Sequence, residues 1–237
     1  MISLVLPVWN EARRVERGVA AARALAAEAG ALGLPPVEII VVDDGSSDDT
    51  AALAERALGT EGRLVRRPHE GKGAALFAGL AIARGDRCLF NDIDWSVSPS
   101  EVQRLLRSPG ELVIAVREGQ GARRLGEPPS RHLVGRAFNR LVQWSVLAGY
   151  EDTQCGCKLI DVAAGRRLLP LLQERGWAYD VELLVAAEER GLRVVQHPVA
   201  WRYEAETRLR PWQDGPAMAR AVWAIRRRQR AGHYRAS

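Results

Sequence analysis

Two acidic residues separated by one position, Asp92 and Asp94, are the part of this sequence best suited to chemistry. They follow the short apolar run Cys88–Phe90, which is typical of the end of a buried strand. Residues two positions apart in an extended segment point the same way, so both carboxylates face one spot beyond the edge of a sheet. A hard divalent ion such as Mg2+ or Mn2+, with phosphate oxygens as further ligands, would relieve their repulsion. The pair alone is also compatible with a turn that carries two solvated acids.

Further polar side chains follow the other apolar runs of the first half of the chain. Asn10 comes after the run at residues 2–8, and Asp44 comes after the run at residues 37–42. Lys72 stands between two glycines, in a loop ahead of the next helical pattern. Ligands of open parallel sheets bind outside the carboxyl ends of the strands, so these side chains are expected to converge on one site.

The elements that carry these residues alternate between apolar runs and helical patterns. This alternation predicts an α/β fold, with a mostly parallel, Rossmann-like sheet that has helices on both faces. The strands expected in the first half span residues 2–8, 37–42, 63–66, 88–90 and 112–116. The second half is expected to hold a mobile loop at 117–131, helices at 131–147, 163–174 and 180–190, strands ending at 160 and 195, and a final helix from 211 or 212. We find no repeat or linker and expect a single domain over residues 1–237.

The composition is that of an ordinary soluble protein, with 47% hydrophobic and 27% charged residues. No apolar run approaches the roughly 20 residues that span a bilayer, and no signal peptide is evident, so we expect a cytoplasmic location. Residues 215–237 hold six arginines and no acid. Such a tail indicates an anionic partner, either nucleic acid or lipid headgroups, unless it is a solvated helix end. The three cysteines lack the second pair of a zinc site and are better interpreted as buried thiols.

Segments in both halves of the chain resemble glycosyltransferase family 2. The first half matches it at Leu6–Glu11, Val41–Asp48, Gly71–Gly73 and Asp92–Asp94. The second half resembles its polyprenyl (dolichyl) phosphate glucosyltransferases at Asp152–Leu159, Trp177–Leu184 and His197–Trp201. The resemblance covers nearly the whole chain and implies the GT-A fold. It implies a nucleotide-sugar-binding half at residues 1–116 and an acceptor-binding half at residues 117–237, which ends in a basic helix.

The resemblance also implies roles for the polar residues at the strand ends. Asp43 or Asp44 would accept hydrogen bonds from the nucleobase, and Lys72 would reach the donor from a flexible loop. Asp92 and Asp94 would hold Mg2+ or Mn2+, which neutralises the leaving diphosphate, so Asp94 is counted as catalytic. The residues expected to bind substrate are Pro7, Asn10, Glu11, Asp43, Asp44, Gly45, Lys72, Asp92, Arg117, Arg123, Arg124, Arg131 and Lys158.

The acceptor implied by the resemblance is a phosphate. A phosphate is already an oxyanion near neutral pH, so it needs cations more than a general base. The arginines of the segment 117–131 are the candidate cations, unless that segment is a solvated basic loop. Asp152 is the best candidate for a catalytic base or for an acid that orients the acceptor. It could equally cap the next turn or pair with Lys158.

These observations predict an inverting enzyme that moves a hexose, first of all glucose from UDP-glucose, to polyprenyl or dolichyl phosphate. GDP-mannose as the donor or a hydroxyl acceptor would keep the same family. The alternative from another class is a non-catalytic nucleic-acid-binding protein, but acids at the site would repel nucleic-acid phosphates. We therefore expect no nucleic-acid partner.

A polyprenyl phosphate keeps its tail in the bilayer, so the protein is expected to dock on an anionic membrane surface, on its inner face. Two parts of the chain are expected to attach it. One is the helix at residues 131–147, with Phe138 and Trp144, and the other is the basic segment at residues 215–237.

Overall fold

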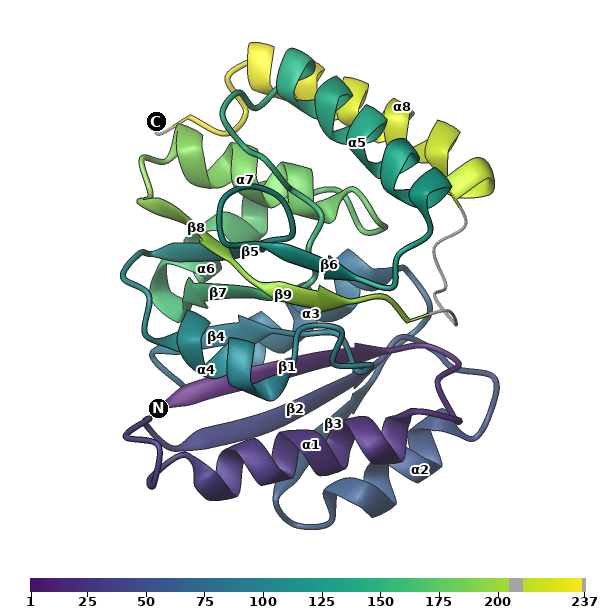
Figure 1. The fold of residues 1–237 in the computed structure, drawn as a ribbon, viewed down its shortest axis with the longest axis vertical. Helices are drawn as coiled ribbons and strands as arrows, with labels where there is room; N and C mark the ends of the chain where they lie inside the picture. Colours follow the sequence, from purple (N-terminus) through teal and green to yellow (C-terminus); the bar gives the residue numbers. More distant parts are fainter. Residues whose placement is uncertain (205–210, 236–237) are drawn as a thin grey trace.

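A seven-stranded sheet forms the centre of the computed structural model, which describes residues 1–204 and 211–235, without the side chains of 211–214 (Figure 1). The strand order is β3-β2-β1-β4-β7-β5-β8. The strands are β1 (Ile2–Val8), β2 (Val37–Asp43), β3 (Gly62–Arg66), β4 (Arg87–Phe90), β5 (Leu112–Val116), β7 (Lys158–Asp161) and β8 (Val194–Pro198). Neighbouring strands run parallel except at β7, which is antiparallel to both β4 and β5. The prediction of a mostly parallel sheet is confirmed.

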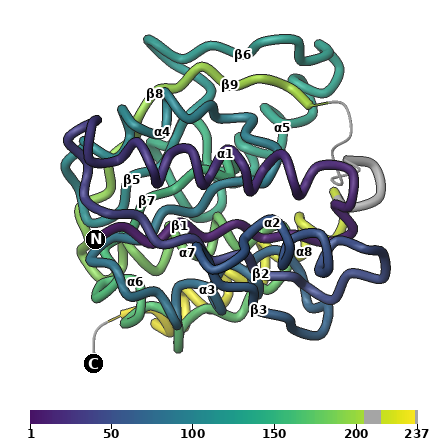
Figure 2. The backbone as a smooth tube through the Cα atoms, turned by 90° about the horizontal axis from the view of Figure 1, so that it is seen from below, coloured from purple at the N-terminus to yellow at the C-terminus, as the bar shows by residue number. Residues whose placement is uncertain are grey.

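Helices cover both faces of this sheet, as predicted. They are α1 (Val15–Glu28), α2 (Thr50–Leu58), α3 (Lys72–Ile82), α4 (Pro99–Leu106), α5 (Pro129–Ser145), α6 (Val162–Leu168), α7 (Tyr179–Glu189) and α8 (Pro211–Arg230). Successive residues of β1 face different cores, because Val5 packs with residues of α3, α6 and α7 and Leu4 packs with residues of α1 and α4. Figure 2 shows these two groups of helices on opposite sides of β1. Burial on both faces explains why the strands read as continuous apolar runs.

Local signals explain where several helices begin and end. Ser98 caps α4 by accepting a hydrogen bond from the backbone N–H of Glu101, and Pro99 occupies its first turn. The prediction of one helix over residues 163–174 is wrong in its second half. The α-helix ends at Leu168 and a short 3-10 turn follows, because Pro170 has no N–H to continue the hydrogen bonding.

The segment 117–131 is not the mobile loop that the sequence predicts. It contains β6 (Arg123–Leu125), which pairs in parallel with β9 (Ala200–Arg202) in a second, two-stranded sheet. The backbone N–H of Arg123 also donates to the carbonyl of Val199, at 3.0 Å. Neither strand is evident from the sequence, because each is three residues long and its partner is distant along the chain.

The carboxyl ends of β1, β2 and β4 meet at one edge of the sheet, where the sequence predicts a site. Hydrogen bonds tie the loops after β1 and β2 together. The side-chain carbonyl of Asn10 accepts from the backbone N–H of Ser47 at 2.8 Å, and its backbone N–H donates to Ser46 Oγ at 2.9 Å. Asn10 holds a φ of 54°, a left-handed conformation that asparagine tolerates better than most residues.

The helices α5 and α8 pack side by side at the edge of the molecule that is uppermost in Figure 1. The predicted start of the last helix, at 211 or 212, is confirmed at Pro211. The final two residues of the predicted basic segment, 236 and 237, lie outside the described residues. Across 1–204 and 211–235, no helix has both the length and the apolar character that crossing a membrane requires. The three cysteines are buried free thiols.

Candidate active site

Asp92 and Asp94 lie in the loop after β4, as predicted, and each faces a cation. Asp92 Oδ1 lies 2.5 Å from Lys72 Nζ, and Asp94 Oδ2 lies 3.8 Å from a guanidinium nitrogen of Arg14. Asp94 also accepts a hydrogen bond from the backbone N–H of Ser96, at 2.9 Å. Burial and the neighbouring Asp92 carboxylate raise the pKa of Asp94. The pair is therefore a crowded negative site, which favours binding of a further cation.

The backbone around the two acids is tightly constrained. Trp95, directly after the pair, has a φ of 54°, and its indole N–H donates to the carbonyl of Gly18 at 2.9 Å. A Cβ on Gly156 would overlap the Asp92 carboxylate, so the segment 152–159 packs directly against this acid. Such constraint limits how far Asp92 and Asp94 can move relative to each other.

Asp92 and Asp94 suit a Mg2+ or Mn2+ ion whose remaining ligands come from a substrate and from water. Within the described part of the chain, no group of three or more His, Cys, Asp or Glu is placed to hold a metal ion. Asp92 and Asp94 thus offer two hard oxygen ligands, and phosphate oxygens and water would supply the others. Mg2+ in particular is commonly held by one or two carboxylates together with substrate phosphates.

A cavity of 1180 Å3 lies on one side of the acids, between the loops after β1, β2 and β3. The predicted site residues that line it are Pro7, Asn10, Glu11, Asp44, Lys72, Asp92 and Asp94. Glu11 also has a structural role, since its carboxylate accepts two hydrogen bonds of 2.7 Å from Arg14. Arg14, which was not predicted, also lines the cavity.

In the turn after β2, only one of the two predicted carboxylates lines the cavity. Asp44 lines the cavity, and its carboxylate accepts from the backbone N–H groups of Glu70 and Gly71 at 3.2 and 2.8 Å. Asp43 does not line the cavity; its carboxylate accepts from the backbone N–H of Ser46. Gly45 is also outside the lining. It has a φ of 73°, and a Cβ there would lie 2.7 Å from the backbone nitrogen of His69. Of the three, only Asp44 lines this cavity.

An aromatic pair at the same cavity was not predicted. The rings of Trp9 and His69 stack with their centroids 4.4 Å apart and their planes 12° apart, and Trp9 is partly exposed. His69 Nδ1 lies 2.7 Å from Asp44 Oδ2, which fixes its ring. The pair offers a flat apolar face to a ligand. The signal was present in the sequence, since Trp9 precedes Asn10 directly.

Lys72 lies in a helix, so the prediction that it belongs to a flexible loop is wrong. It is the first residue of α3, and its ammonium lies 5.5 Å from the ring centre of Trp177. A Cβ on Gly73 would lie 2.5 Å from Cβ of Tyr179, so the glycines serve close packing rather than mobility. Burial opposes the charge on Lys72, but the surrounding aspartates, first of all Asp92, raise its pKa. Lys72 thus remains a cation beside the acids.

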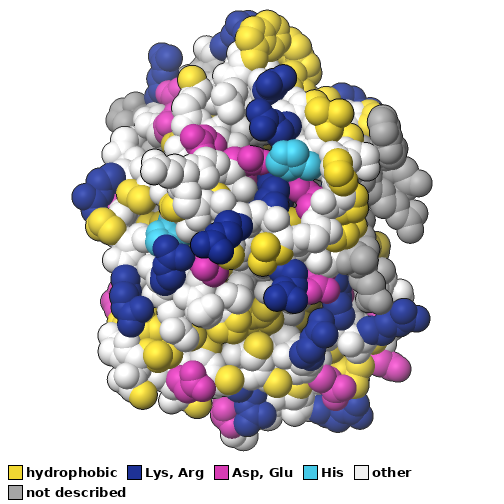
Figure 3. Space-filling model, viewed as in Figure 1, with side chains coloured by type: hydrophobic (Ala, Val, Ile, Leu, Met, Phe, Trp, Pro, Cys, Tyr) yellow, Lys and Arg dark blue, Asp and Glu magenta, His cyan; other side chains and the backbone are white. Residues whose placement is uncertain are grey.

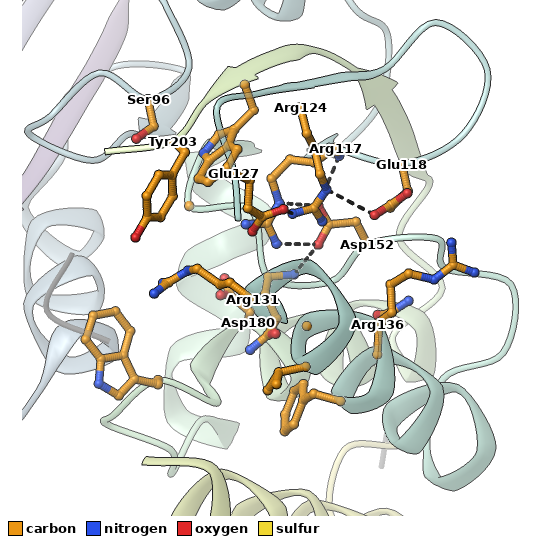
Figure 4. A pocket seen from close by; sticks show the side chains of 18 of the residues that line it. Ser96, Arg117, Glu118, Arg124, Glu127, Arg131, Arg136, Asp152, Asp180 and Tyr203 are labelled. Atoms are coloured by element: carbon orange, nitrogen blue, oxygen red, sulfur yellow. Dashed lines mark hydrogen bonds and ion pairs between the residues drawn. The ribbon is translucent and has the colours of Figure 1, made fainter. Parts of the chain in front are cut away.

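A second cavity, of 530 Å3, shares part of its lining with the first, and Figure 4 shows side chains that line it. Lys72, Asp92, Asp94 and Trp177 line both cavities. The second cavity is bounded by β6, α5, the segment around Asp152 and β9. The two cavities therefore adjoin at the same two carboxylates.

Arg117 and Asp152 form a two-pronged ion pair in the wall of the second cavity (Figure 4). Arg117 Nε and Nη2 donate to the carboxylate at 2.6 and 2.9 Å, and the backbone N–H groups of Arg117 and Gln154 donate at 3.0 Å each. Burial opposes ionisation of Asp152, but Arg117 outweighs it and holds the pKa of this carboxyl below its usual value. Asp152 is thus a weak base that positions Arg117, which argues against the predicted role as general base. It does not pair with Lys158.

The other predicted arginines are placed differently from one another. Arg124 lines the second cavity, and its guanidinium lies 2.7 Å from Glu127 and 3.0 Å from Glu118. Arg131 lines the cavity over the ring of Tyr203, at 5.4 Å. Arg123 is exposed and does not line the cavity, because neighbouring residues of β6 point to opposite faces. The prediction for Arg123 therefore does not match its position.

Two arginines of α5, Arg136 and Arg140, line the second cavity and were not predicted. No described residue forms an ion pair with either of them, in contrast to Arg117 and Arg124. They are four residues apart, so one helix face presents both. The apolar residues of this helix are evident from the sequence, whereas the role of the two arginines depends on the position of the helix beside the cavity.

Lys158 is not where the sequence predicts it, because it lies behind Asp180 and away from the cavity. Lys158 is fully buried and does not line the cavity; its ammonium lies 2.5 Å from Asp180 Oδ1 and from the carbonyl oxygen of Cys155. Asp180, which was not expected in the site, lines the cavity. Burial raises the pKa of Asp180 and outweighs the opposing charge of Lys158. Lys158 therefore supports Asp180 instead of contacting a substrate.

Lys158→Met is expected to lower the free energy of unfolding by about 3–5 kcal/mol, because it leaves the Asp180 carboxylate buried without its partner. Urea denaturation at pH 7 measures this change. The double variant Lys158→Met/Asp180→Leu should recover most of the loss, since an apolar pair of similar volume needs no compensating charge. Equal stability of the single variant and the unaltered protein would show that the pair is not needed.

The family model described as glycosyl transferase family 2 matches residues 3–154. The chain is 31% identical over 249 residues to the glycosyltransferase AglD of Haloferax volcanii, an alignment that covers 97% of this chain and 38% of AglD. It is 31% identical over 224 residues to dolichyl-phosphate beta-glucosyltransferase ALG5C of Trichomonas vaginalis, with 88% and 66% of the two chains covered. The chain thus spans between about a third and two thirds of these relatives.

Solved structures support the same assignment. The TM-score is 0.66, at 26% identity, to glucosyl-3-phosphoglycerate synthase from Mycobacterium tuberculosis in complex with Mn2+, UDP-glucose and phosphoglyceric acid. That alignment covers 98% of this chain and 80% of the other. The family match includes the loops after β1, β2 and β4, which hold Asn10, Asp44 and the two acids. The chain therefore belongs to glycosyl transferase family 2.

Proposed function

We propose that this protein transfers a hexose, glucose from UDP-glucose, to polyprenyl phosphate at a membrane surface, with inversion at the sugar. The observation that carries the proposal is the meeting of two cavities at Asp92, Asp94 and Lys72. One cavity is large enough for a nucleotide sugar, and the other is lined with arginines, which suit a phosphate. Several relatives are named dolichyl-phosphate beta-glucosyltransferases, among them one from Homo sapiens that is 29% identical over 256 residues.

Each part of the junction has a role in this reaction. Asp92 and Asp94 would hold a divalent cation, which when bound neutralises the charge that develops on the leaving diphosphate. Lys72 is a second cation at the same place, and its contact with Asp92 is open to exchange for a phosphate oxygen. Arg14, which lines the first cavity, forms an ion pair with Asp94. The acceptor phosphate would approach from the second cavity, beside Arg131.

The weak basicity of Asp152 supports a phosphate acceptor over a hydroxyl acceptor. A hydroxyl nucleophile needs a base that takes its proton, and Asp152 has its lone pairs engaged by Arg117 and two backbone N–H groups. A phosphate oxyanion has no proton to lose. It needs positive charge, and the pair of Arg117 and Asp152 keeps one guanidinium fixed at the cavity wall.

Turnover with matched substrates tests this function. We would measure release of nucleoside diphosphate from UDP-glucose and from GDP-mannose, with polyprenyl phosphate, a polyprenol or phosphoglyceric acid as the acceptor and Mg2+ or Mn2+ present. UDP-glucose with polyprenyl phosphate is expected to be fastest. Turnover of the polyprenol or of phosphoglyceric acid, with none of polyprenyl phosphate, would reject the proposed acceptor.

We also propose that the face of Trp9 stacks on the nucleobase. Trp9→Ala is then expected to weaken binding of UDP about 5- to 150-fold, the effect of losing one base–aromatic contact. Isothermal titration calorimetry measures the affinity, and Trp9→Phe should restore most of it. Trp223→Ala removes another exposed tryptophan, far from this cavity, and should leave UDP binding unchanged. Wild-type affinity of Trp9→Ala would assign the base to another surface.

A further inference from the structure

The outward face of α5 combines apolar and cationic side chains. Leu133 and Trp144 are 69% and 71% exposed, and Arg136 and Arg140 are exposed between them. These four residues recur at spacings of three and four positions, so they lie along one side of the helix. The helix Pro129–Ser145 contains no Asp or Glu. Large apolar side chains exposed in this way mark an interaction surface.

The outward face of α8 has the same character. Arg220, Arg227 and Arg230 are exposed on one side of the helix together with Trp223, which is 52% exposed. The opposite side is buried in the protein, through Met218, Val222 and Ile225. Residues 215–235 contain no Asp or Glu.

One arginine joins the two faces. The guanidinium of Arg226 lies 5.3 Å from the ring centre of Trp144 on α5 and 5.3 Å from that of Trp223 on α8. The two exposed indoles therefore belong to one continuous surface. Figure 3 shows hydrophobic and basic side chains together over the top of the molecule, where α5 and α8 lie. We name this surface the α5–α8 face and define it by Leu133, Arg136, Arg140, Trp144, Arg220, Trp223, Arg226, Arg227 and Arg230.

We propose that the α5–α8 face docks on the surface of an anionic lipid bilayer. Indole rings favour the boundary between headgroups and acyl chains, and arginines favour the negative headgroup layer. The face supplies both, and neither α5 nor residues 215–230 of α8 contain an acid that would repel the lipid. Charge also disfavours a second copy as the occupant, because two such faces would bring like charges together.

The position of the second cavity supports the same occupant. Arg136 and Arg140 belong to the α5–α8 face and also line this cavity, as do the apolar side chains of Val134 and Phe138. The cavity therefore opens at the edge of the docking surface. In this respect the inference rests on the proposed function: a lipid phosphate could enter the cavity while its tail stays in the bilayer.

The structure also narrows which parts of the predicted basic segment face the membrane. Arg228 is turned inward, where it lies 2.8 Å from both Glu174 and Glu182. Tyr234 is fully buried, and its hydroxyl donates to Glu182 at 2.6 Å. Deletion of residues 215–237 would therefore remove part of the core. Point substitutions on the α5–α8 face avoid this problem.

Flotation with lipid vesicles tests the docking surface without any sugar transfer. The unaltered protein is expected to bind vesicles of phosphatidylcholine with 30% phosphatidylglycerol. It should bind less in 1 M than in 0.1 M salt, because the Debye length falls from about 10 Å at 0.1 M to about 3 Å at 1 M. Arg220→Glu/Arg227→Glu should weaken binding at least about 20-fold, since each basic residue near the surface contributes about fivefold. Trp144→Ser/Trp223→Ser should weaken it at both salt concentrations.

Control variants carry comparable substitutions at exposed positions elsewhere. Arg56→Glu on α2 and Ile82→Ser at the end of α3 alter exposed side chains away from α5 and α8, and both should bind like the unaltered protein. Far-UV circular dichroism and thermal melting confirm that each variant is folded. Absence of vesicle binding, or equal binding by the paired variants and the unaltered protein, would overturn the proposal. A dimer that only Trp144→Ser/Trp223→Ser dissociates, or salt-sensitive binding to RNA in place of vesicles, would also overturn it.

Transfer assays separate this proposal from the proposed function. With a short, water-soluble prenyl phosphate as the acceptor, Trp144→Ser/Trp223→Ser should keep the activity of the unaltered protein. With polyprenyl phosphate embedded in vesicles, the same variant should lose most of its activity. Equal loss with both acceptors would overturn the docking role, whereas absence of transfer by the unaltered protein, together with normal vesicle binding, would reject only the proposed function.

Discussion

Asp94→Asn is expected to reduce sugar transfer about a thousandfold or more. The change removes one of the two negative charges at the junction of the cavities, and with it the proposed cation that stabilises the leaving diphosphate. Asparagine keeps the shape of the side chain and an oxygen that can accept the 2.9 Å hydrogen bond from the N–H of Ser96. The rate of UDP release at saturating substrate, measured over a range of Mg2+ and Mn2+ concentrations, reports the loss.

Two controls separate a metal role from a structural one. Excess chelator should abolish transfer by the unaltered protein, and added Mg2+ or Mn2+ should restore it. Asp86→Asn removes an exposed carboxylate directly before β4, at the end of the strand opposite to the site, and should leave the rate unchanged. If Asp94→Asn transferred sugar at the normal rate in excess chelator, the proposed metal site would be wrong.

The double variant Arg131→Ala/Arg136→Ala is expected to reduce kcat/KM for the acceptor about 10^2- to 10^4-fold. Both side chains line the second cavity, and neither lies on the side of Asp44 and Trp9. Loss of one charged hydrogen bond costs about 1.5–3 kcal/mol, and two such losses give this range. A soluble prenyl phosphate should be used, so that membrane docking does not contribute. The KM for UDP-glucose should hardly change.

Arg123→Ala is the matched control for this experiment. Arg123 belongs to the same basic segment but is exposed on the far side of β6 from the cavity. It should therefore behave like the unaltered protein. Unchanged acceptor kinetics in the double variant would assign the phosphate to other groups, and a parallel rise in the KM for UDP-glucose would indicate general damage to the site.

The sequence predicts the first half of the fold well because local signals agree with the global arrangement. Apolar runs covered on both faces identify β1, β2 and β4, and polar residues that end those runs identify the edge of the sheet where the site lies. The cap at Ser98 and the proline after it locate α4. These features depend on residues close together along the chain, so no knowledge of the tertiary structure is needed.

Contacts between distant residues could not be derived in the same way. The sequence provides Arg117, Asp152, Lys158 and Asp180 but does not say which cation meets which acid, because the choice depends on the positions of β7 and α7. The short strand β6 exists only through its pairing with β9. Arg136 and Arg140 were overlooked for another reason: a helix between a cavity and the surface has two functional faces, and a search for one apolar stripe finds only one of them.

The strand β7 has a consequence for how the protein is made. It lies between β4 and β5 and runs against both, although it follows them in sequence. During synthesis, β1 to β5 leave the ribosome before β7. At that stage the nascent sheet has a gap at its centre, and the edges of β4 and β5 that face the gap are unpaired. The gap closes only after residues 158–161 emerge. The first half is therefore not an independent folding unit, and exposed edges of this kind must be kept from pairing with other chains during synthesis.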